Sequence, residues 1–327
     1  MGQKMMRAAL IREIGRDAEM GEVSEPVCGP GKALVQVQAG SINPLDLLIA
    51  SGKFYLGHPP LPYVPGVEGV GVVIEGDKIA PGTRVRFECG VLSPYGSLAP
   101  LTLIEEDAAM FVSDDAPADL VASLGISGLA AWLSLAWRAR LTKGERVLVL
   151  GATGAVGQIA IQVAKLLGAS QVVGASRNRN VLNEVLTLGA DAIVELDGRG
   201  APELAAAFKE AAGGPIDVVI DTLWGPPVLG AMMAAGLGAR VVNIGQSAGD
   251  SVSIPSAILR GKMISLLGHN NLFVPKEERQ KAFGQLLEHA MRGDLEVKHE
   301  VIPLERVSEA WRLQRESPHR KLVLLPS

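Results

Sequence analysis

The sequence predicts an α/β protein in which a β-rich segment is followed by a doubly wound parallel sheet. Two observations support this class. Short apolar runs alternate with helix-patterned segments from Asp119 to about Arg260, and such alternation builds a parallel sheet covered by helices. The first third of the chain is instead rich in Gly and Pro, with strand-like patches between turn signals. A chain of 327 residues is long enough for two domains.

The first predicted strands lie in the β-rich segment, which ends near Pro117. Ala33–Ala39 and Arg84–Phe87 alternate apolar and polar residues, and Val70–Glu75 is rich in β-branched residues. Pro-Gly and Gly-Pro pairs separate these runs and mark tight turns. The pattern indicates a compact, mostly β domain.

The parallel sheet begins at Val147–Gly157, with the sequence VLVLGATGAVG. Its first four residues form a wholly apolar run, as expected of a strand buried on both faces. Glycines crowd the turn that follows, and from Val156 to Leu167 apolar residues recur at helical spacing until Gly168 ends the pattern.

A strand, a glycine-rich turn and a helix in this order are typical of the opening of a dinucleotide-binding unit. Bare backbone lets a pyrophosphate approach, and the helix amino terminus offers N–H donors to its charge. The glycine pattern is incomplete because Ala152 stands at its first position, so a tight turn without a ligand is the alternative. The predicted contacts in this turn are Gly151, Thr153, Gly154, Ala155 and Val156.

The remaining elements continue the alternation to the end of the chain. Predicted strands are Gln171–Ala175, Ala192–Leu196, Asp217–Asp221, Arg240–Ile244, Met263–Leu267 and Lys321–Leu325. Predicted helical segments are Val181–Leu188, Pro202–Ala212, the Ala-rich Val228–Gly236 and Lys276–Arg292. Ligands bind at the carboxyl ends of strands in doubly wound sheets, so Leu223 and Gly245 are further candidate cofactor contacts.

The residues after the second strand of the sheet indicate which cofactor binds. An NAD site places Asp or Glu here to hold the ribose 2′-hydroxyl, and that carboxylate would repel a 2′-phosphate. This chain has Ser176, Arg177, Asn178 and Arg179, with no acid among them. Guanidinium groups match a phosphate dianion, so Ser176, Arg177 and Arg179 predict NADPH. The alternative is a pair of solvated arginines on a loop.

Composition excludes several other classes of protein. The formal charge of −4 gives no basic excess for nucleic acid, and two distant cysteines, Cys28 and Cys89, suit a reducing, cytoplasmic compartment. Leu120–Trp137 contains 18 residues without a charge, which is the threshold for a membrane span. Gly and Ser dilute this stretch, so we expect a buried helix and no membrane partner.

Several motifs together resemble one known family. They are the N-P-x-D segment in Ser41–Asp46, the L-P-x-x-P-G-x-E-x-x-G stretch in Leu61–Gly71, the G-D-R-V-like turn Gly82–Val85, the glycine turn Ala152–Gly157 and the terminal Arg320–Leu324. In this order they resemble the zinc-free branch of the medium-chain dehydrogenases/reductases, the quinone oxidoreductase-like proteins.

The resemblance implies a GroES-like β-rich catalytic domain plus a Rossmann domain with the doubly wound parallel sheet. The catalytic domain would comprise residues 1–119 and 270–327, and the Rossmann NADP-binding domain residues 120–269. It further implies an active cleft between the domains and a homodimer, in which the strand matching Met263–Leu267 often pairs across the interface. Arg320 resembles a family position that approaches the cofactor.

The resemblance also predicts that no metal is bound. Where the zinc branch has a Cys and a His ligand, this chain has Asn43 and Val67, which are poor zinc ligands. The structural zinc lobe of that branch needs four closely spaced cysteines, and the chain has two in total. We therefore expect no metal site and no metal-polarised alkoxide.

The expected proton donors of the family are partly missing. Enoyl-thioester reductases of the family carry a Tyr where this chain has Phe54, although the adjacent Tyr55 could replace it if the loop shifted by one residue. Ala130 stands where relatives carry a Thr near the nicotinamide. Asn43 is the remaining polar candidate, either orienting substrate or occupying a turn before Pro44, and Asp46 is interpreted as a helix N-cap.

These observations predict an NADPH-dependent oxidoreductase that transfers a hydride to a quinone or an α,β-unsaturated carbonyl compound. A quinone tolerates the loss of protic side chains because its reduced anion is resonance-stabilised and can take a proton from water. One alternative is an enoyl-thioester (enoyl-CoA or enoyl-ACP) reductase that uses Tyr55. Another is a catalytically decayed nucleotide-binding protein with a structural or regulatory role.

Overall fold

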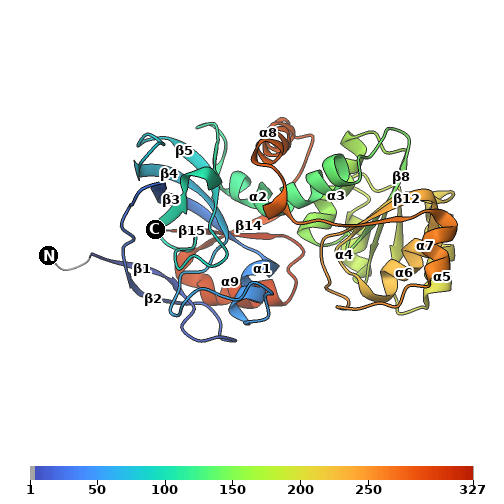
Figure 1. Cartoon of the computed structure of the whole chain (residues 1–327), viewed down its shortest axis with the longest axis horizontal. Helices are drawn as coiled ribbons and strands as arrows, with labels where there is room; N and C mark the ends of the chain where they lie inside the picture. The colour runs from blue at the N-terminus through green and yellow to red at the C-terminus, as the bar shows by residue number, and fades with distance from the viewer. Residues whose placement is uncertain (1–3, 327) are drawn as a thin grey trace. The chain divides into compact units, whose positions relative to one another are not determined.

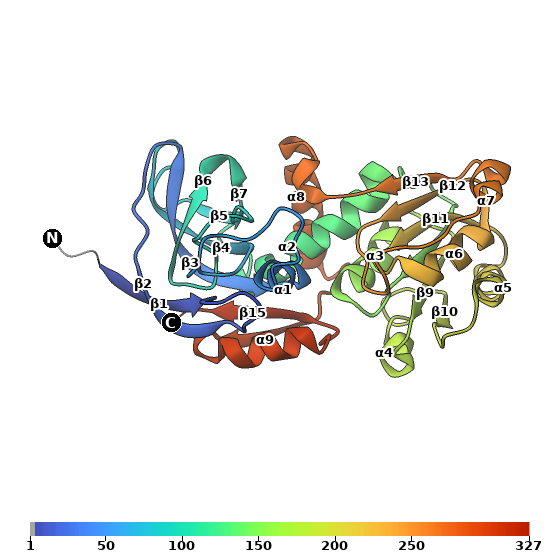
Figure 2. The same cartoon turned by 60° about the horizontal axis from the view of Figure 1, so that its bottom comes forward.

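The computed structural model describes residues 4–326, which divide into two compact units. One unit contains the described residues up to Gly125 together with those from Val297 onward, and the other is Ile126–Glu296. Each unit is built on its own main sheet, as Figures 1 and 2 show, and β1 and β2 of the first unit form a separate antiparallel pair. The predicted α/β class, with a β-rich part and a parallel sheet, is confirmed.

The first unit is organised by a mainly antiparallel sheet of order β14-β15-β3-β4-β5-β7, with β6 also paired to β3. β15, from the end of the chain, pairs with β3 and so joins the two terminal parts of the sequence. Val35, Val73 and Phe87 are fully buried in the apolar core. The elements are β1 (Met5–Leu10), β2 (Glu19–Ser24), β3 (Lys32–Ile42), α1 (Pro44–Ala50), β4 (Glu68–Gly76), β5 (Arg84–Glu88), β6 (Leu101–Glu105), η1 (Glu106–Ala108), β7 (Ala109–Phe111), β14 (His299–Pro303), η4 (Leu304–Arg306), α9 (Val307–Arg315) and β15 (Lys321–Leu325).

The second unit contains the parallel sheet, whose strand order is β10-β9-β8-β11-β12-β13. Counted along the chain this order is 3-2-1-4-5-6, the arrangement of the doubly wound dinucleotide-binding fold. It reverses between β8 and β11, which is where ligands bind in such sheets. The elements are η2 (Ser134–Arg138), β8 (Arg146–Leu150), α3 (Ala155–Leu166), β9 (Gln171–Ser176), α4 (Arg179–Glu184), β10 (Ala192–Glu195), α5 (Ala201–Ala212), β11 (Ile216–Asp221), α6 (Gly225–Ala234), β12 (Ala235–Asn243), α7 (Ser256–Lys262), β13 (Ser265–Gly268), η3 (Asn271–Phe273) and α8 (Lys276–Arg292).

Several predicted elements have different bounds in the structure, and three of them show why. The helix predicted over Val181–Leu188 is α4, which ends at Glu184 and continues as turns with i to i+3 hydrogen bonds. The strand predicted over Arg240–Ile244 begins five residues earlier, since β12 follows α6 without a loop. β13 begins two residues later than predicted because Met263 ends α7 in the left-handed conformation, with φ of 51°.

The boundaries between the units also differ from the predicted 119/120 and 269/270. The chain leaves the first unit only after Gly125, because Asp119 at the start of α2 (Ala118–Leu133) pairs with His299 (Oδ2–Nε2 3.1 Å). It re-enters that unit only at Val297. The side chain of Gln162 accepts from the backbone N–H of Glu296 at 2.8 Å and donates to its carbonyl at 2.9 Å, which holds the segment after α8 in the second unit.

The apolar stretch Leu120–Trp137 forms α2 and the π-helical turn η2. By length and composition, the helix from Ala118 to Arg138 is apolar enough to cross a membrane. However, 78% of its most apolar window is buried inside the protein, which agrees with the predicted buried helix.

Candidate active site

The glycine turn after β8 is shaped by close backbone packing. Gly151 has φ of +84°, and a Cβ there would lie 2.1 Å from Thr222 Oγ1. A Cβ on Gly157 would lie 2.3 Å from the carbonyl oxygen of Gly151. Both positions therefore need Gly because of contacts within the protein.

Gly154 is different from these two glycines. Its φ of −76° suits any residue, and a Cβ would meet its nearest neighbour, the Gly151 oxygen, at an ordinary 3.5 Å. Packing within the protein therefore does not require Gly at this position, whereas close approach of a ligand to the backbone would. Gly154 is the N-cap of α3, and Ala155 and Val156 follow in the first turn, where a helix offers their N–H groups no acceptor of its own. The turn thus fits a pyrophosphate group.

Thr222, which sequence reasoning missed, lies at the centre of this edge of the sheet. The hydroxyl of Thr222 donates to the carbonyl of Leu150 at 3.0 Å. A Cβ on Gly245 would lie 2.8 Å from the carbonyl oxygen of Thr222. The structure therefore brings the predicted residues Gly151 and Gly245 together around Thr222, with Leu223 adjacent. The available signal was the position of Thr222, directly after the predicted strand Asp217–Asp221.

Asp221, also missed, orders the loop after β11. Its Oδ1 accepts from the backbone N–H groups of Leu223 and Trp224, both at 2.9 Å, and its Oδ2 accepts from Asn243 Nδ2 at 3.0 Å. Burial raises the pKa of this carboxyl, and the three hydrogen bonds oppose the shift. Leu223 is thereby positioned by a side chain that is itself fully buried.

The segment after β9 carries the other predicted cofactor contacts. Ser176 ends β9, and its Oγ lies 2.8 Å from Oγ1 of Thr153 in the glycine turn, with both residues buried. This hydroxyl pair links two parts of the predicted site that are distant in sequence. Arg177 and Arg179 are exposed, and Arg179 Nη1 pairs with Glu195 Oε2 at 2.8 Å.

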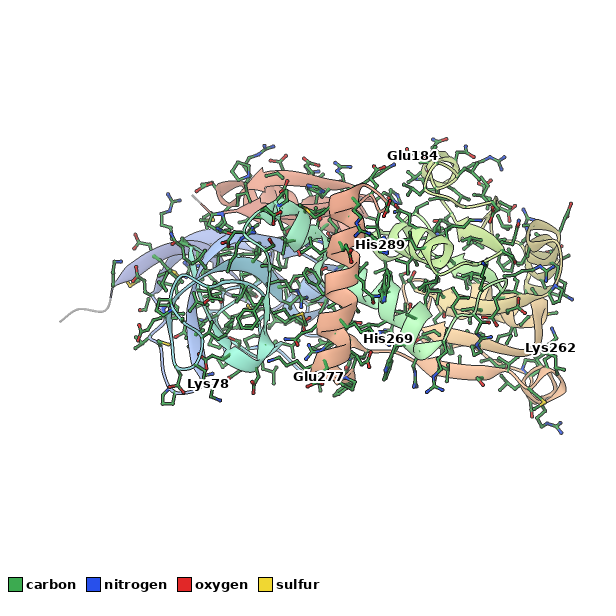
Figure 3. All side chains as sticks on the ribbon, turned by 90° about the horizontal axis from the view of Figure 1, so that it is seen from above. Lys78, Glu184, Lys262, His269, Glu277 and His289 are labelled. Carbon is green, nitrogen blue, oxygen red and sulfur yellow. The ribbon has the colours of Figure 1, made fainter. Side chains whose placement is uncertain are left out.

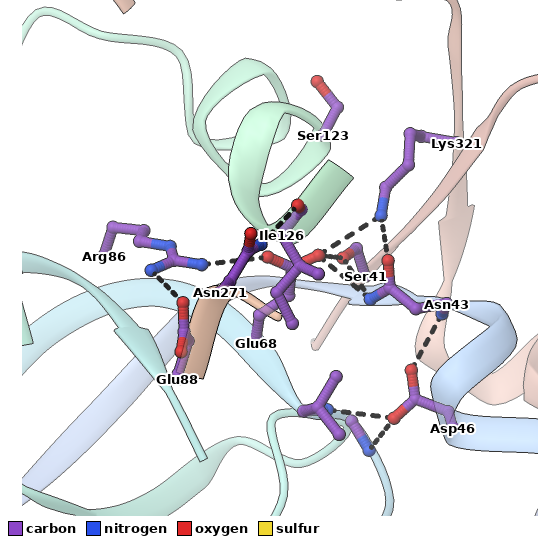
Figure 4. Close-up of polar contacts among 12 residues, drawn as sticks. Ser41, Asn43, Asp46, Glu68, Arg86, Glu88, Ser123, Ile126, Asn271 and Lys321 are labelled. Carbon is purple, nitrogen blue, oxygen red and sulfur yellow. Dashed lines mark hydrogen bonds and ion pairs between the residues drawn. The ribbon is translucent and has the colours of Figure 1, made fainter. Parts of the chain in front are cut away.

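In the first unit, a buried network of charges surrounds Glu68 (Figure 4). Glu68 Oε1 accepts from Ser41 Oγ at 2.7 Å, from Asn43 Nδ2 at 2.9 Å and from Lys321 Nζ at 3.2 Å. Its Oε2 pairs with Arg86 Nη2 at 3.2 Å, and Arg86 Nη1 pairs with Glu88 Oε1 at 2.7 Å.

The charges of this network balance. Burial raises the pKa of Glu68, but Lys321 and Arg86 outweigh it, so the pKa lies below its ordinary value. Cations and carboxylates alternate in the order Lys321, Glu68, Arg86, Glu88. This pairing offsets part of the free energy that is needed to remove the four charges from water.

Glu68 also accounts for the break in α2. Gly125 has non-helical backbone angles, and a Cβ there would lie 1.8 Å from Glu68 Oε2. No residue with a side chain fits this position unless the carboxylate moves.

The N-cap role predicted for Asp46 is wrong, and Asn43 takes that position in α1. The side chain of Asn43 makes no cap hydrogen bond. Its amide oxygen accepts from Lys321 Nζ at 2.5 Å instead. Asp46 is the third helical residue, where its Oδ2 accepts from the N–H of Asn43 at 2.8 Å and its Oδ1 from the N–H groups of Gly66 and Val67 at 3.1 and 2.9 Å. A carboxyl group at this position reaches both the start of the helix and a neighbouring loop.

Other predicted site residues of the first unit lie at the surface. The side chain of Tyr55 is 69% exposed, and its ring centroid is 4.6 Å from that of the buried Phe54. Arg320 pairs with Glu300 of β14 (Nη2–Oε2 2.6 Å). The catalytic role of Asn43 and Tyr55 and the cofactor role of Arg320 stay predictions.

Among residues 4–326, no group of three or more His, Cys, Asp or Glu side chains could hold a metal ion. Figure 3 shows His269, after β13, and His289, on α8, as separate side chains. His269 Nε2 hydrogen-bonds with Asn271 Oδ1 at 2.9 Å, and His289 Nδ1 pairs with Asp294 Oδ2 at 3.2 Å.

Family models match most of the chain. Residues 29–113 match the alcohol dehydrogenase GroES-like domain, and residues 155–288 match the zinc-binding dehydrogenase domain. The chain belongs to the medium-chain dehydrogenase/reductase family. The GroES-like and Rossmann domains implied by the sequence are thereby confirmed.

Relatives place this family member with the quinone oxidoreductase type. It is 29% identical to quinone oxidoreductase-like protein 2 of Rattus norvegicus, over 98% of this chain and 92% of the relative. It is 29% identical to the quinone oxidoreductase of Sus scrofa, over 94% of each protein. A mycobacterial protein solved in complex with NADPH has the same fold, with a TM-score of 0.86, 22% identity and coverage of 98% of this chain and 100% of that one. The chain is thus an oxidoreductase of this family.

Replacing two glycines of the turn should separate stability from binding. In Gly157→Ala the Cβ would clash with backbone atoms, so we expect a loss of about 1–3 kcal/mol in the free energy of unfolding. Gly154→Ala should cost about 1 kcal/mol or less, the difference between Gly and Ala as N-cap residues, yet weaken nucleotide binding. Chemical denaturation and titration with NADPH measure the two effects. Unchanged NADPH affinity in Gly154→Ala would contradict this account.

Asp46 should make stability depend on pH. Burial, opposed by backbone hydrogen bonds, raises its pKa from 3.8 to about 6. The native state then binds its proton more tightly than the unfolded state, so the contribution of Asp46 is complete below pH 4 and is lost as pH rises through 6. The loss amounts to about 3 kcal/mol. The difference in unfolding free energy between wild type and Asp46→Asn should therefore shrink by about this amount from pH 4 to 7. A constant difference would refute the assignment.

Proposed function

We propose that this protein is a zinc-independent NADPH oxidoreductase that transfers a hydride to a quinone or an α,β-unsaturated carbonyl compound. The observation that carries the proposal is the site at the carboxyl edge of β8 and β9. There, the bare backbone of Gly154 opens α3, and Arg177 and Arg179 follow Ser176. The names of the quinone oxidoreductase relatives support the same reading.

Residues of the second unit would hold NADPH. The N–H groups of Ala155 and Val156 suit its pyrophosphate, and Arg177 and Arg179 suit the 2′-phosphate because guanidinium groups donate in pairs to phosphate oxygens. When bound, the cofactor supplies the hydride. The buried Thr153–Ser176 hydroxyl pair fixes the glycine turn against the end of β9, so the backbone donors are ordered in advance.

Zinc independence is supported by the side chains that replace the metal ligands. Val67 is aliphatic, and its N–H is taken by Asp46. The amide of Asn43 is occupied by Lys321 and Glu68 at 2.5 and 2.9 Å. A neutral, internally paired network thus stands where the zinc branch of the family carries ligands. Reduction would then proceed without a metal-polarised alkoxide.

The proposed acceptor follows from the proton donors that remain. Phe54 and Ala130 supply no proton, and both are buried. A quinone needs no positioned donor, and an activated enone needs little more. We propose that Asn43 orients the acceptor or the nicotinamide ribose through the second lone pair of its amide oxygen, since Lys321 engages the first.

An enoyl-thioester reductase is the second candidate. Its specific support is Tyr55, whose exposed hydroxyl side chain could act as a proton donor to a carbanion.

We also propose a cytoplasmic homodimer formed through β13. This strand has one neighbour in its sheet, β12, so its other edge offers backbone groups to a second copy. Met263 and Leu266 are 71% and 40% exposed beside that edge. Cys28 and Cys89 are both free thiols, which supports a reducing compartment.

A panel of acceptors tests the reaction class. Oxidation of NADPH should be supported by quinones and enones and proceed undiminished in Tyr55→Phe. Turnover of enoyl thioesters that is lost in Tyr55→Phe would favour the second candidate instead. Tight NADPH binding with no active acceptor would favour a decayed nucleotide-binding protein.

Arg177→Glu tests the cofactor assignment. A carboxylate at this position repels the 2′-phosphate and can accept from a 2′-hydroxyl, so the preference should change from NADPH to NADH. The dissociation constants of both nucleotides measure the effect. Unmoved NADPH affinity would show that the 2′-phosphate does not lie near this residue.

Replacing Leu266 by Lys should prevent dimer formation, because a charged residue on an edge strand opposes pairing with another chain. Light scattering should give twice the chain mass for wild type and a single chain mass for Leu266→Lys. Leu186→Lys, at another apolar residue with 43% exposure, is the control. A monomeric wild type would rule out this interface.

A further inference from the structure

An acidic residue lies beside the predicted 2′-phosphate site, although the segment after β9 contains none. Glu195 is the last residue of β10 and the register partner of Ser176, the last residue of β9. The backbone N–H of Leu196 donates to the carbonyl of Ser176 at 2.9 Å, which keeps the two strand ends together. The next strand therefore supplies the carboxylate that the sequence of β9 lacks.

This carboxylate engages one of the two arginines. Arg179 Nη1 lies 2.8 Å from Glu195 Oε2, and the side chains are 68% and 29% exposed. Glu195 is the more buried partner and belongs to the sheet, so it anchors the longer and more exposed Arg179 side chain. Arg199 is also near Glu195, but it pairs with Asp197 (Nη2–Oδ2 2.6 Å). It therefore does not replace Arg179 as the partner of Glu195.

We propose that Glu195 determines cofactor specificity, by holding Arg179 in an ion pair that the 2′-phosphate of NADPH must break. The inference rests on the proposed NADPH function. A phosphate and a carboxylate compete for one guanidinium, so Glu195 weakens NADPH binding. The 2′-hydroxyl of NADH meets no such competition and can donate to the carboxylate. Glu195 therefore makes the preference for NADPH smaller than two unopposed arginines would give.

Glu195→Gln tests the proposal by equilibrium titration of the full chain with NADPH and with NADH. Removing the carboxylate charge should tighten NADPH binding about two- to fivefold, the range of an exposed ion pair. NADH affinity should stay equal or fall. The gain should shrink as salt is added, because salt screens exposed charges. Glu288→Gln is the matched control, since it breaks another exposed carboxylate–arginine pair, with Arg292, on α8 of the same unit.

A second variant shows whether Glu195 acts through Arg179. In an Arg179→Gln background, Glu195→Gln should no longer tighten NADPH binding, because there is no guanidinium left to release. A gain that persists in full there would overturn the proposed ion-pair competition. An unchanged ratio of NADPH to NADH affinity in Glu195→Gln, with wild type binding NADPH, would overturn this inference and leave the proposed function standing. Failure of wild type to bind either nucleotide would overturn both.

Discussion

The second unit depends on one steric constraint, the close packing of backbone around the glycine turn after β8. Gly157 brings the first turn of α3 against the carbonyl of Gly151, and Gly151 packs on the hydroxyl of Thr222 after β11. These contacts direct α3 away from the end of β8 at the point where the strand order reverses. The unpaired N–H groups at the start of α3 are thereby placed at the edge of the sheet where doubly wound folds bind their ligands.

The first unit depends on charge compensation around Glu68. The Glu68 carboxylate contacts a hydroxyl from β3, the amide of the residue before α1, and two cations from β5 and β15. A buried ion without partners would cost several kcal/mol, so this part of the unit is stable only when these elements assemble together. Lys321 lies in β15, so the network around Glu68 forms only when this last strand pairs with β3. Asn43 is held in the same network, so its orientation follows from the charges around it.

Cofactor recognition divides into a steric part and an electrostatic part. In the proposed function, the turn at Gly154 would accept a pyrophosphate from either nucleotide, because backbone N–H groups contact only the phosphates. Under the proposed function, discrimination at the ribose would depend on the charges at the ends of β9 and β10, where Arg177 and Arg179 follow β9 and Glu195 pairs with Arg179. A small change in that balance would alter the preferred nucleotide without disturbing the fold.

The sequence alone determined the fold class, the family, the glycine turn and the arginines after β9, because each is written in contiguous residues as apolar periodicity, glycine spacing or a local motif. The ends of helices and strands were harder to predict from the sequence. The predicted start of β13 was wrong because Met263 ends α7 in the left-handed conformation. Only the tertiary structure placed Thr222 under Gly151, Glu195 beside Arg179 and Lys321 against Glu68. Asn43 and Asp46 showed the same limit, because their hydrogen-bond partners come from distant strands and loops. Contacts between segments far apart in the chain leave no periodic signal, so packing and charge compensation in the folded state decide them.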